Sequence, residues 1–485
     1  MKREFIGDVA GKFKVALKDD SNKTIAYLLW GDSVRVISKS GSMVKVSARG
    51  RVGWIAKDIL TDTGLLELYV IDVGQGDCVL MRTPNNAWHL IDAGVSNETQ
   101  MTKKGAANFI RWKFLEDLEM DRVKLENVIL SHMDFDHYGG LIDLFSGKVS
   151  RPDRTFDISV ENFYHNGMGR FKDSPKLGTT ISGTVPLLPY DDYRISRDDH
   201  FIIELLSGKA SFKKPSRPFE PKSFAPLARL VGKIPKHVRS ISASDQFLPG
   251  YDQNSNVVIR VLGPILEHIN SGKVGLRELG SESITCNGHS IVLRIDYGKS
   301  RILLTGDLNT ISQRLLLSYH DLLEFSVDVA KGCHHGSDDI DIRFVRAMKA
   351  RSTIVSSGDN EDYAHPRPRV MGASARYGRE AKSVKGHTLP PLLYSTELAR
   401  SVQLAYADTV RSVSDRTRQI ECKDAELKSV ERGAKFIRME NLPVATDLIY
   451  GLINVRTDGE RIMCAYMKEQ SQDFDVQVFQ AGVEP

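Results

Sequence analysis

Short strand patterns alternate with turns over the first sixty residues of the chain. Apolar and polar positions alternate in KFKVAL, SVRVIS and MVKVSA, and a Gly-Arg turn leads into VGWIAKDIL. Four or five short strands at this spacing predict a small β-barrel over residues 1–64.

From Leu65 the pattern changes to buried strands that alternate with helices. LLELYVIDVG and AWHLIDAG are nearly continuous apolar runs ending in glycine turns, which is typical of strands covered on both faces. NFIRWKFLEDL predicts an amphipathic helix, NVILS a short strand and GGLIDLF the start of a helix. Further strands are predicted at VVIRVLGP, SIVLRIDYG, RILLTGD, SVDVAKG and STIVSSG. This alternation predicts an α/β sandwich over residues 65–390.

Two regions depart from that pattern. Between about residues 147 and 256 the hydrophobic periodicity weakens and Pro, Ser, Lys and Asp become frequent, which predicts a long insertion.

After Pro391, the segment STELARSVQLAYADTVRSV predicts a helix. LIYGLINVR and ERIMCAYMKE then flank an Asp-Gly turn, which is a strong hairpin signal. Residues 391–485 are therefore predicted to be a C-terminal extension made of a helix and a β-hairpin.

The composition predicts an ordinary globular protein. The 485 residues are 41% hydrophobic and 26% charged, which excludes collagenous and wholly disordered chains. The net charge of +4 does not by itself indicate a nucleic-acid partner. No uncharged apolar run approaches the ~18 residues of a membrane span, and the first residues lack a signal-peptide core. We therefore expect a cytoplasmic protein with no membrane contact. The five cysteines form no C-x-x-C pair, so reduced, buried thiols are expected.

The sharpest chemical signal is the segment SHMDFDHYGG at residues 131–140, between a predicted strand and a predicted helix. In an extended loop the side chains of His132, Asp134 and Asp136 can point the same way, while Asp136 and the adjacent His137 splay towards a second centre. Imidazole and carboxylate groups are ligands for zinc, manganese and iron. The segment therefore predicts a site that binds two metal ions.

Three later segments add candidates at predicted strand ends. Asp307 follows RILL and Gly306, where it could bridge two cations or cap the next helix. His334 and His335 stand in KGCHHGS, and His365 follows the strand STIVSS. Each histidine alone is more often structural than ligating, but their shared position at strand ends beside the first motif favours a metal site.

The N-terminal segment resembles bacterial SH3-like domains. Gly50, Val52, Gly53, Trp54 and Ile55 match the G-x-V-G-W-I-like signature of their final strands. The resemblance implies a module that binds a peptide, a cell-wall fragment or a neighbouring domain. A protein partner is therefore one of the alternatives.

The central region resembles the metallo-β-lactamase superfamily, in particular the branch typified by the metallo-β-lactamase domain of the competence protein ComEC. Six motifs occur in the family's order within residues 66–370. They are DVGQGD at 72–77, LIDAG at 90–94, HMDFDHYGG at 132–140, LLTGD at 303–307, HHGS at 334–337 and HP at 365–366. The resemblance implies a four-layer αβ/βα sandwich and a metal-dependent hydrolase.

The resemblance also implies roles for the first motif. His132 and Asp134 would hold one divalent ion, Asp136 and His137 the other, and Asp307 would bridge them. Asp134 stands where the superfamily more often has His. A second carboxylate makes the site harder, so Mn²⁺ is as plausible as Zn²⁺.

The remaining ligands come from later motifs. His289, in the segment NGHS, fits the third ligand of the first ion. For the last ligand of the second ion, His365 competes with the pair His334 and His335, and His365 is favoured. The pair is then assigned to proton donation and, together with Ser337, to phosphate contacts.

Two acidic residues are expected to support this centre. Asp92, at the strand end in LIDAG, would orient a ligating histidine of the catalytic site. Asp77 would orient the same loop. The reaction itself would use a water activated by the two ions rather than a side-chain nucleophile.

Two basic stretches bear on the substrate. Residues 209–239 contain nine Lys and Arg and a single acid, interleaved with three phenylalanines, and a second cluster follows the His365 loop. Such stretches are expected for a polyanion held through its phosphates, although charge runs are often simply solvated. The candidate substrate contacts are Lys213, Lys214, Arg217, Arg367 and Arg369.

The sequence thus predicts a metal-dependent phosphodiesterase that hydrolyses nucleic acid, with DNA favoured. One alternative is a two-metal hydrolase of a small anionic substrate such as a cyclic nucleotide, lactone or thioester. Another is a non-enzymatic protein that recruits a partner through the SH3-like module. The oligomeric state is left open.

Overall fold

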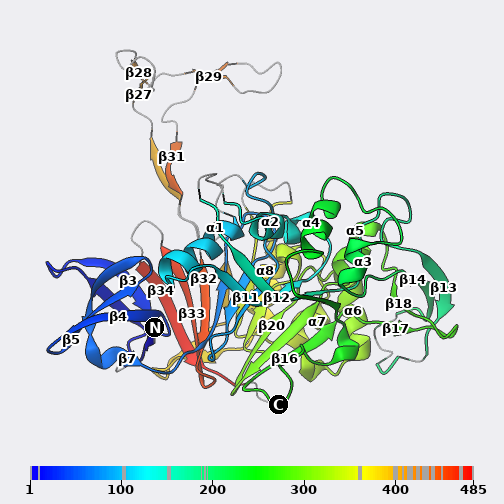
Figure 1. The fold of residues 1–485 in the computed structure, drawn as a ribbon, viewed down its shortest axis with the longest axis horizontal. Coiled ribbons are helices and arrows are strands. Elements are labelled where there is room, and N and C mark those ends of the chain that lie inside the picture. Colours follow the sequence, from blue (N-terminus) through cyan, green and yellow to red (C-terminus); the bar gives the residue numbers. More distant parts are fainter. Residues whose placement is uncertain are drawn as a thin grey trace.

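The first strand pattern folds into a seven-stranded antiparallel sheet at the N-terminal end of the computed structural model (Figure 1). The strand order is β3-β2-β6-β5-β4-β1-β7. Alternating apolar residues such as Leu17, Leu28, Val46 and Ile55 fill its core. The strands predicted here are confirmed, and the likeness to an SH3-like barrel stays a prediction. The bounds are β1 (Glu4–Ile6), β2 (Lys14–Lys18), β3 (Thr24–Leu29), β4 (Ser33–Ser40), β5 (Met43–Ala48), β6 (Arg51–Ala56) and β7 (Leu60–Thr61).

The structure describes most of the chain in full. Within residues 397–451 it describes only the backbone of the strands β26 to β31. The fully described residues are 3–8, 11–100, 105–149, 154–186, 188–190, 193, 195–358, 363–396, 452–468 and 473–482.

The central body contains a nine-stranded mixed sheet with the order β15-β12-β11-β10-β9-β8-β32-β33-β34. The four neighbouring strands β15, β12, β11 and β10 run parallel to one another. All other neighbouring strands of this sheet are antiparallel. The bounds are β8 (Leu66–Val70), β9 (Val79–Arg82), β10 (Trp88–Ile91), β11 (Val123–Leu130), β12 (Ile158–His165), β15 (His237–Ser240), β32 (Ile453–Thr457), β33 (Arg461–Lys468) and β34 (Asp473–Gln480).

A six-stranded sheet with the order β16-β19-β20-β21-β22-β25 packs against it. One core joins the two sheets, with Val70 and Ile129 from the first and Ile259, Ile302 and Val329 from the second. From β20 to β25 the strands run parallel, so their carboxyl ends meet at one edge. The bounds are β16 (Val257–Gly263), β19 (Val292–Tyr297), β20 (Ser300–Leu304), β21 (Val329–Lys331), β22 (Ser352–Val355) and β25 (Leu392–Ser395).

Helices pack on each sheet away from this shared core (Figure 1). Ile110, Leu141 and Leu227, from α1, α2 and α4, join the core of the nine-stranded sheet. Leu316 and Phe344, from α6 and α7, join that of the six-stranded sheet. The mixture of sheets and helices confirms the predicted α/β class. The bounds are α1 (Ala106–Arg111) with a π-helical continuation (Trp112–Asp117), α2 (Phe135–Phe145), α3 (Lys209–Lys213), α4 (Phe224–Val231), α5 (Glu282–Gly288), α6 (Thr310–Tyr319), α7 (Ile342–Met348) and α8 (Pro368–Tyr377).

The region predicted as one insertion contributes two strands to the central sheet. Both β12 and β15 fall within residues 147–256, so the prediction is wrong for these strands. Their sequences mix apolar with polar positions, which hid them in a polar stretch. A separate four-stranded sheet does stand beside the body, in the order β13-β14-β18-β17. Its bounds are β13 (Thr180–Thr184), β14 (Asp198–Ile202), β17 (Glu267–His268) and β18 (Val274–Arg277).

The C-terminal region also differs from the prediction. Strands β26 (Val402–Tyr406) and β27 (Thr409–Arg411) lie where a helix is predicted, so that prediction is wrong. The predicted hairpin is confirmed as β32 and β33, but β32 pairs with β8 and therefore belongs to the central sheet. The remaining strands are β23 (Ala381–Lys382), β24 (Thr388–Leu389), β28 (Gln419–Glu421), β29 (Glu426–Lys428), β30 (Phe436–Arg438) and β31 (Pro443–Leu448).

A buried ionic network joins the N-terminal sheet to the central sheet. Asp32 Oδ1 lies 2.7 Å from Arg456 Nη2, and Asp32 Oδ2 lies 2.7 Å from Arg49 Nε. Glu67 pairs with Arg82 at 2.6 Å, and Arg82 also donates to the carbonyl of Gly31. Buried charges need such partners, so the network holds the two units in one fixed arrangement.

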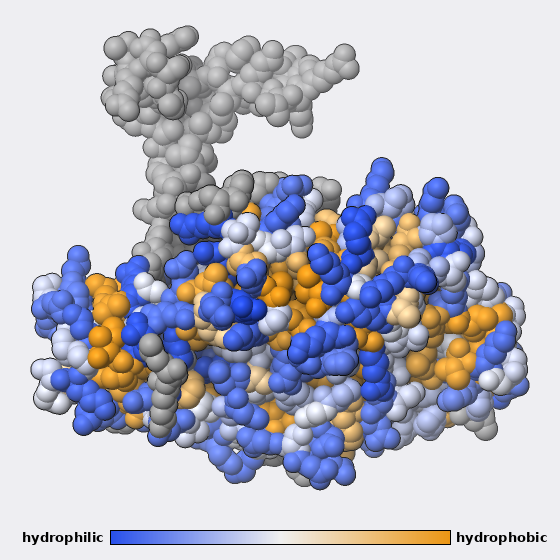
Figure 2. Space-filling model, viewed as in Figure 1, coloured by the Kyte–Doolittle hydropathy of each residue, from blue (hydrophilic) through white to orange (hydrophobic). Residues whose placement is uncertain are grey.

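In the view of Figure 2, hydrophobic areas lie among hydrophilic residues over the N-terminal sheet, over the middle of the central body and near the four-stranded sheet. Among the described helices, none has the length and hydrophobicity needed to cross a membrane. Cys422 lies outside the described residues. The cysteines found buried and free are Cys78, Cys286, Cys333 and Cys464.

Candidate functional site

The candidate site lies where strands of both sheets end. Strand β11 leads through residues 131–134 into the first turn of α2, and residues 305–307 and 332–337 follow β20 and β21. In an α/β fold, loops at the carboxyl ends of parallel strands form ligand sites. Gly76 allows the loop before β9 to lie close to the first turn of α2. Its φ is 102°, and a Cβ would lie 1.7 Å from the carbonyl oxygen of Asp136.

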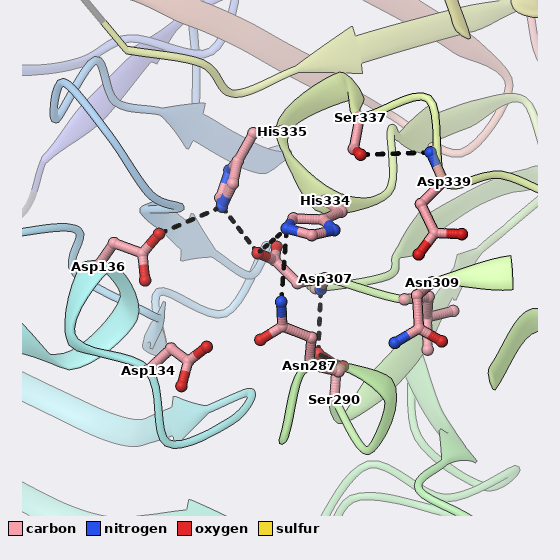
Figure 3. Close-up of polar contacts among 12 residues, drawn as sticks. Asp134, Asp136, Asn287, Ser290, Asp307, Asn309, His334, His335, Ser337 and Asp339 are labelled. Carbon is pink, nitrogen blue, oxygen red and sulfur yellow. Dashed lines mark hydrogen bonds and ion pairs between the residues drawn. The ribbon is translucent and has the colours of Figure 1, made fainter. Parts of the chain in front are cut away.

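Four buried side chains converge at this edge. Asp77, His137, Asp307 and His335 each offer a ligand atom, and these atoms lie within 4.8 Å of one another. His335 Nε2 is 2.8 Å from Asp307 Oδ2 and 3.6 Å from Asp136 Oδ2 (Figure 3). His137 Nε2 is 3.2 Å from Asp307 Oδ2. Imidazole and carboxylate groups gathered at this spacing could hold a divalent ion.

A carboxylate and a backbone carbonyl orient the histidines of this set. Asp92 Oδ2 is 2.8 Å from His137 Nδ1, and His335 Nδ1 lies 3.1 Å from the carbonyl oxygen of Ser356, with Asp77 Oδ1 3.4 Å away. These contacts leave the Nε2 atom of each histidine directed at the centre. The contact of Asp92 with a candidate ligand matches the prediction. Because Asp92 is buried and acts through His137, it is a positioning residue rather than one that meets the substrate.

The pair expected at the first ion is only partly assembled. His132 is buried, and its Nε2 lies 3.8 Å from Asp134 Oδ2. Asp134 forms an ion pair with Arg170, whose Nε also donates to the carbonyl of Met133. A metal ion bound by Asp134 would therefore share this carboxylate with a guanidinium.

His289 does not join the site, so its prediction as a ligand is wrong. Its Nε2 lies 2.7 Å from the carbonyl oxygen of Arg277 in β18. The turn that ends α5 directs the imidazole that way and brings Asn287 to the centre instead. Asn287 Nδ2 is 3.4 Å from His334 Nε2 (Figure 3).

His335, rather than His365, belongs to the converging set, which corrects the preferred assignment of both residues. His334 and His335 have φ values of 45° and 51°, and this backbone turns the His335 side chain inwards. His334 keeps 27% of its side chain exposed, 3.9 Å from Asp307 Oδ2. The His365 ring lies 6.0 Å from that of His334 and stacks on Tyr363. The predicted role in proton transfer therefore suits His334 and not the buried His335.

Three residues at the site were not predicted as its members. Lys331 is 3% exposed, and its Nζ contacts Asp77 Oδ2 and lies 3.7 Å from Asp307 Oδ1. Arg170 holds Asp134, and Gln75 Nε2 is 3.2 Å from Asp136 Oδ2. A lysine that ends a buried strand three residues before a histidine pair was a usable signal for Lys331. No sequence signal pointed to Arg170, because it lies in the region interpreted as an insertion.

Proton binding opposes metal binding at this centre. Burial lowers the pKa of His335, but Asp307 and Asp77 outweigh burial and raise the pKa to about 10. The pKa of His137 is also well above its usual value, because Asp307 and Asp92 outweigh burial. Burial raises the pKa of Asp307, but His335 and His137 hold it well below its usual range.

We expect metal affinity to increase with pH. Because His137 and His335 are protonated near neutral pH without an ion, binding must release up to two protons. Affinity should therefore rise by up to about 100-fold per unit between about pH 6 and 8. Calorimetric titration with Mn²⁺ in buffers of different ionisation enthalpy measures this release. An affinity independent of pH would contradict the protonated state.

The first basic stretch is less available for substrate than predicted. Arg217 pairs with Glu204 at 3.0 Å and stacks on Phe171, so its assignment as a substrate contact is corrected to a structural role. Lys213 and Lys214 are exposed. The three phenylalanines cannot stack on bases, because all are buried: Phe212, Phe219 and Phe224.

The second basic cluster begins beside the histidine pair. The N–H of Arg367 donates to the carbonyl of Gly336 at 2.8 Å, and Arg369 Nη1 donates to the carbonyl of Asp338 at 3.1 Å. Ser337 Oγ accepts from the N–H of Asp339 at 3.2 Å (Figure 3). Ser337, Arg367 and Arg369 therefore lie in or against the loop that carries His334 and His335.

Part of the chain is similar to known proteins. Residues 71–148 match the metallo-beta-lactamase superfamily, as the sequence predicts. The chain is 32% identical over 104 residues to Competence protein ComA of Neisseria gonorrhoeae, which covers 21% of this chain and 15% of that protein. It is 29% identical over 92 residues to ComE operon protein 3 of Bacillus subtilis (strain 168), covering 19% and 12%. Each match thus spans a small part of the relative.

A solved structure also aligns with this chain. The metallo-beta-lactamase fold protein YhfI from Bacillus subtilis is 12% identical, with a TM-score of 0.31, and the alignment covers 68% of this chain and 95% of YhfI.

Proposed function

We propose that this chain, in which residues 71–148 are a metallo-beta-lactamase superfamily segment, is a metal-dependent phosphodiesterase that hydrolyses nucleic acid, with DNA favoured. The observation that carries the proposal is the convergence of Asp77, His137, Asp307 and His335 in one buried set. Its position beside the motif of residues 131–140 links the set to the segment that matches the superfamily.

The donor atoms fit divalent metal ions. Among the described residues, the Nε2 atoms of His132, His137 and His335 and Oδ1 of Asp307 are buried and make no hydrogen bond, although the Nε2 atoms of His137 and His335 lie within ion-pair distance of Asp307 Oδ2. Buried polar atoms left in this way are costly, and an ion would satisfy them. Asp136, His137, Asp307 and His335 would hold one ion, and His132 would contribute to a second. Nitrogen and oxygen donors without thiolate suit Zn²⁺ or Mn²⁺.

The side chains around the ions have separate tasks. Bound ions supply an activated water and stabilise charge on a phosphoryl group. Burial lowers the pKa of His334, so this imidazole is neutral near pH 7 and can take up a proton during the reaction and return it at the leaving oxygen. Lys331 and Arg170 offset the charges of Asp77 and Asp134, which eases the approach of a phosphate.

Nucleic acid is supported as the substrate by two independent observations. Arg367 and Arg369 lie against the histidine loop, and Lys213 and Lys214 are exposed. The curated relative ComA is a competence protein, which supports the handling of nucleic acid. Phosphate contacts by such side chains would make affinity strongly dependent on salt.

Replacing Arg367 and Arg369 together by Met is expected to weaken DNA binding. The slope of log affinity against log salt concentration should fall by about 2, because two phosphate contacts are lost. Fluorescence anisotropy in an Asp136→Ala, His137→Ala background measures binding without cleavage. The pair Lys12→Met, Lys39→Met carries the same charge change on the N-terminal sheet and should leave the slope unchanged. Equal slopes for the two double variants would remove these arginines from the proposal.

Substrate class is tested by incubating the purified chain and Mn²⁺ or Zn²⁺ with linear DNA, circular DNA, RNA and a small phosphodiester. The proposal predicts cleavage of a polymer that weakens steeply with salt. The small-substrate alternative predicts turnover of the small diester that is insensitive to salt. A non-enzymatic binding protein would cleave none of them, and elemental analysis would find no bound metal.

The proposal includes the domain architecture of the protein and its location in the cell. The seven antiparallel strands of residues 1–64 support an SH3-like barrel. The two packed sheets with helices outside support the four-layer αβ/βα sandwich of the superfamily. The buried network around Asp32 favours a fixed docking role for the barrel over recruitment of a protein partner. A cytoplasmic location is part of the same proposal.

A further inference from the structure

A pocket of about 700 Å³ lies at the junction between the N-terminal sheet and the central body, on residues outside the metal centre. Strand β3 and the turn at residues 49–51 form one wall. Helix α1 with its π-helical continuation forms another, and β8 and β32 contribute the floor. Ligand pockets of this size commonly occur between domains.

Four aromatic side chains line the pocket: Tyr27, Tyr69, Phe109 and Trp112. The Phe109 ring lies 6.0 Å from that of Tyr69 and 5.7 Å from that of Trp112. Leu452 and Met467 add apolar surface. A lining of this kind suits a flat, unsaturated ring.

The floor carries a polar group without a partner. Asn454 pairs in register with Tyr69, is 1% exposed and lines the pocket. Its Nδ2 is buried and makes no hydrogen bond to any described residue, whereas its Oδ1 accepts from Arg456 at 3.4 Å. An unpaired buried amide donor is costly, and a ligand with an acceptor atom on its ring would satisfy it.

The uncompensated charge at the pocket is positive. The acids Glu116 and Asp117 pair with Arg111 and Lys113, and Arg49 pairs with Asp32. Within the described residues, the exposed Arg51 and Arg154 at the rim have no carboxylate partner. An anionic group on the ligand would find two guanidinium groups there.

The buried ion pairs of Asp32 and Glu67 keep the two walls in place. We propose that this junction pocket binds a nucleoside monophosphate, with the base among the aromatic side chains, a base acceptor on Asn454 Nδ2 and the phosphate on Arg51 and Arg154. The inference does not depend on the proposed nuclease activity.

The test is calorimetric titration of the full chain with AMP, GMP, CMP and TMP, in EDTA and with the substitutions Asp136→Ala and His137→Ala. These conditions keep the metal centre from taking the phosphate. At least one nucleotide should bind with a stoichiometry near one. Asn454→Leu should weaken it by about tenfold, as expected for the loss of one buried hydrogen bond. Arg51→Met with Arg154→Met should weaken it at least as much.

The matched control is Lys12→Met with Lys39→Met, which removes two exposed charges outside the pocket lining and should leave binding unchanged. Inorganic phosphate and the free nucleosides should each bind more weakly than the nucleotide. The melting temperature of Asn454→Leu separates a loss of binding from a loss of folding. The inference is overturned if no nucleotide saturates the chain at about 5 mM, or if the folded pocket variants bind like the wild type. It is also overturned if phosphate alone binds as tightly as the nucleotide.

Discussion

Replacing Asp307 by Asn is expected to reduce metal-dependent DNA cleavage by about 10³-fold or more, because charge stabilisation at the reacting centre dominates such reactions. Asp307 Oδ2 faces the Nε2 atoms of both His137 and His335, so this carboxylate is common to the converging set. Asn keeps the shape of the side chain and removes its charge. The bound metal per chain should fall with the rate, and elemental analysis of the desalted protein measures it.

The matched control for this change is Asp338→Asn. Asp338 is exposed in the loop after the histidine pair, and the change removes the same charge outside the converging set. Its rate and metal content should equal those of the wild type. If the Asp307→Asn variant kept the cleavage rate and the metal content of the wild type, Asp307 would not be a ligand and the assignment of the site would be wrong.

Replacing Asp32 by Ala is expected to lower the free energy of unfolding by about 3–5 kcal/mol, because the buried Arg456 loses the closer of its two carboxylate partners and keeps only Glu67, at 3.9 Å. Arg456 has no exposed side-chain surface, and only 4% of the Asp32 side chain is exposed. Asp32 also accepts from the N–H of Leu29. The loss should appear in urea denaturation as a lower midpoint.

The Asp32 carboxylate also makes the stability of the fold depend on pH in the acid range. Burial raises the pKa of Asp32, but Arg456 and Arg49 outweigh burial and bring it far below its usual value. Its contribution to stability is therefore complete above about pH 4 and is lost as the pH falls further. The control is Glu460→Ala, which breaks an exposed pair with Lys299 and should change stability little. A midpoint for Asp32→Ala equal to that of this control would contradict the buried network.

The sequence located the strand ends that carry the candidate ligands, because buried strands followed by Gly, Asp and His leave a clear pattern. It could not settle which histidine completes the set. The backbone of His334 and His335 turns through positive φ values, and this turn sends His335 inwards. Nothing in a histidine pair indicates such a turn.

Contacts between distant residues were the other limit. Asp134 has the spacing of a ligand, but Arg170 reaches it from a region without a clear strand pattern. The C-terminal hairpin could be predicted from its Asp-Gly turn, whereas its pairing with β8 depends on residues nearly four hundred positions earlier in the chain. Local pattern predicts an element but not the partner that it meets in the fold.

The most direct test of the account is the cleavage of labelled duplex DNA by the Mn²⁺-loaded chain and by its Asp136→Ala, His137→Ala variant, with bound metal measured on the same samples. The account predicts cleavage by the wild type and loss of both cleavage and metal in the folded variant. Equal cleavage by the two proteins, or metal-loaded wild type without activity on DNA or RNA, would contradict it.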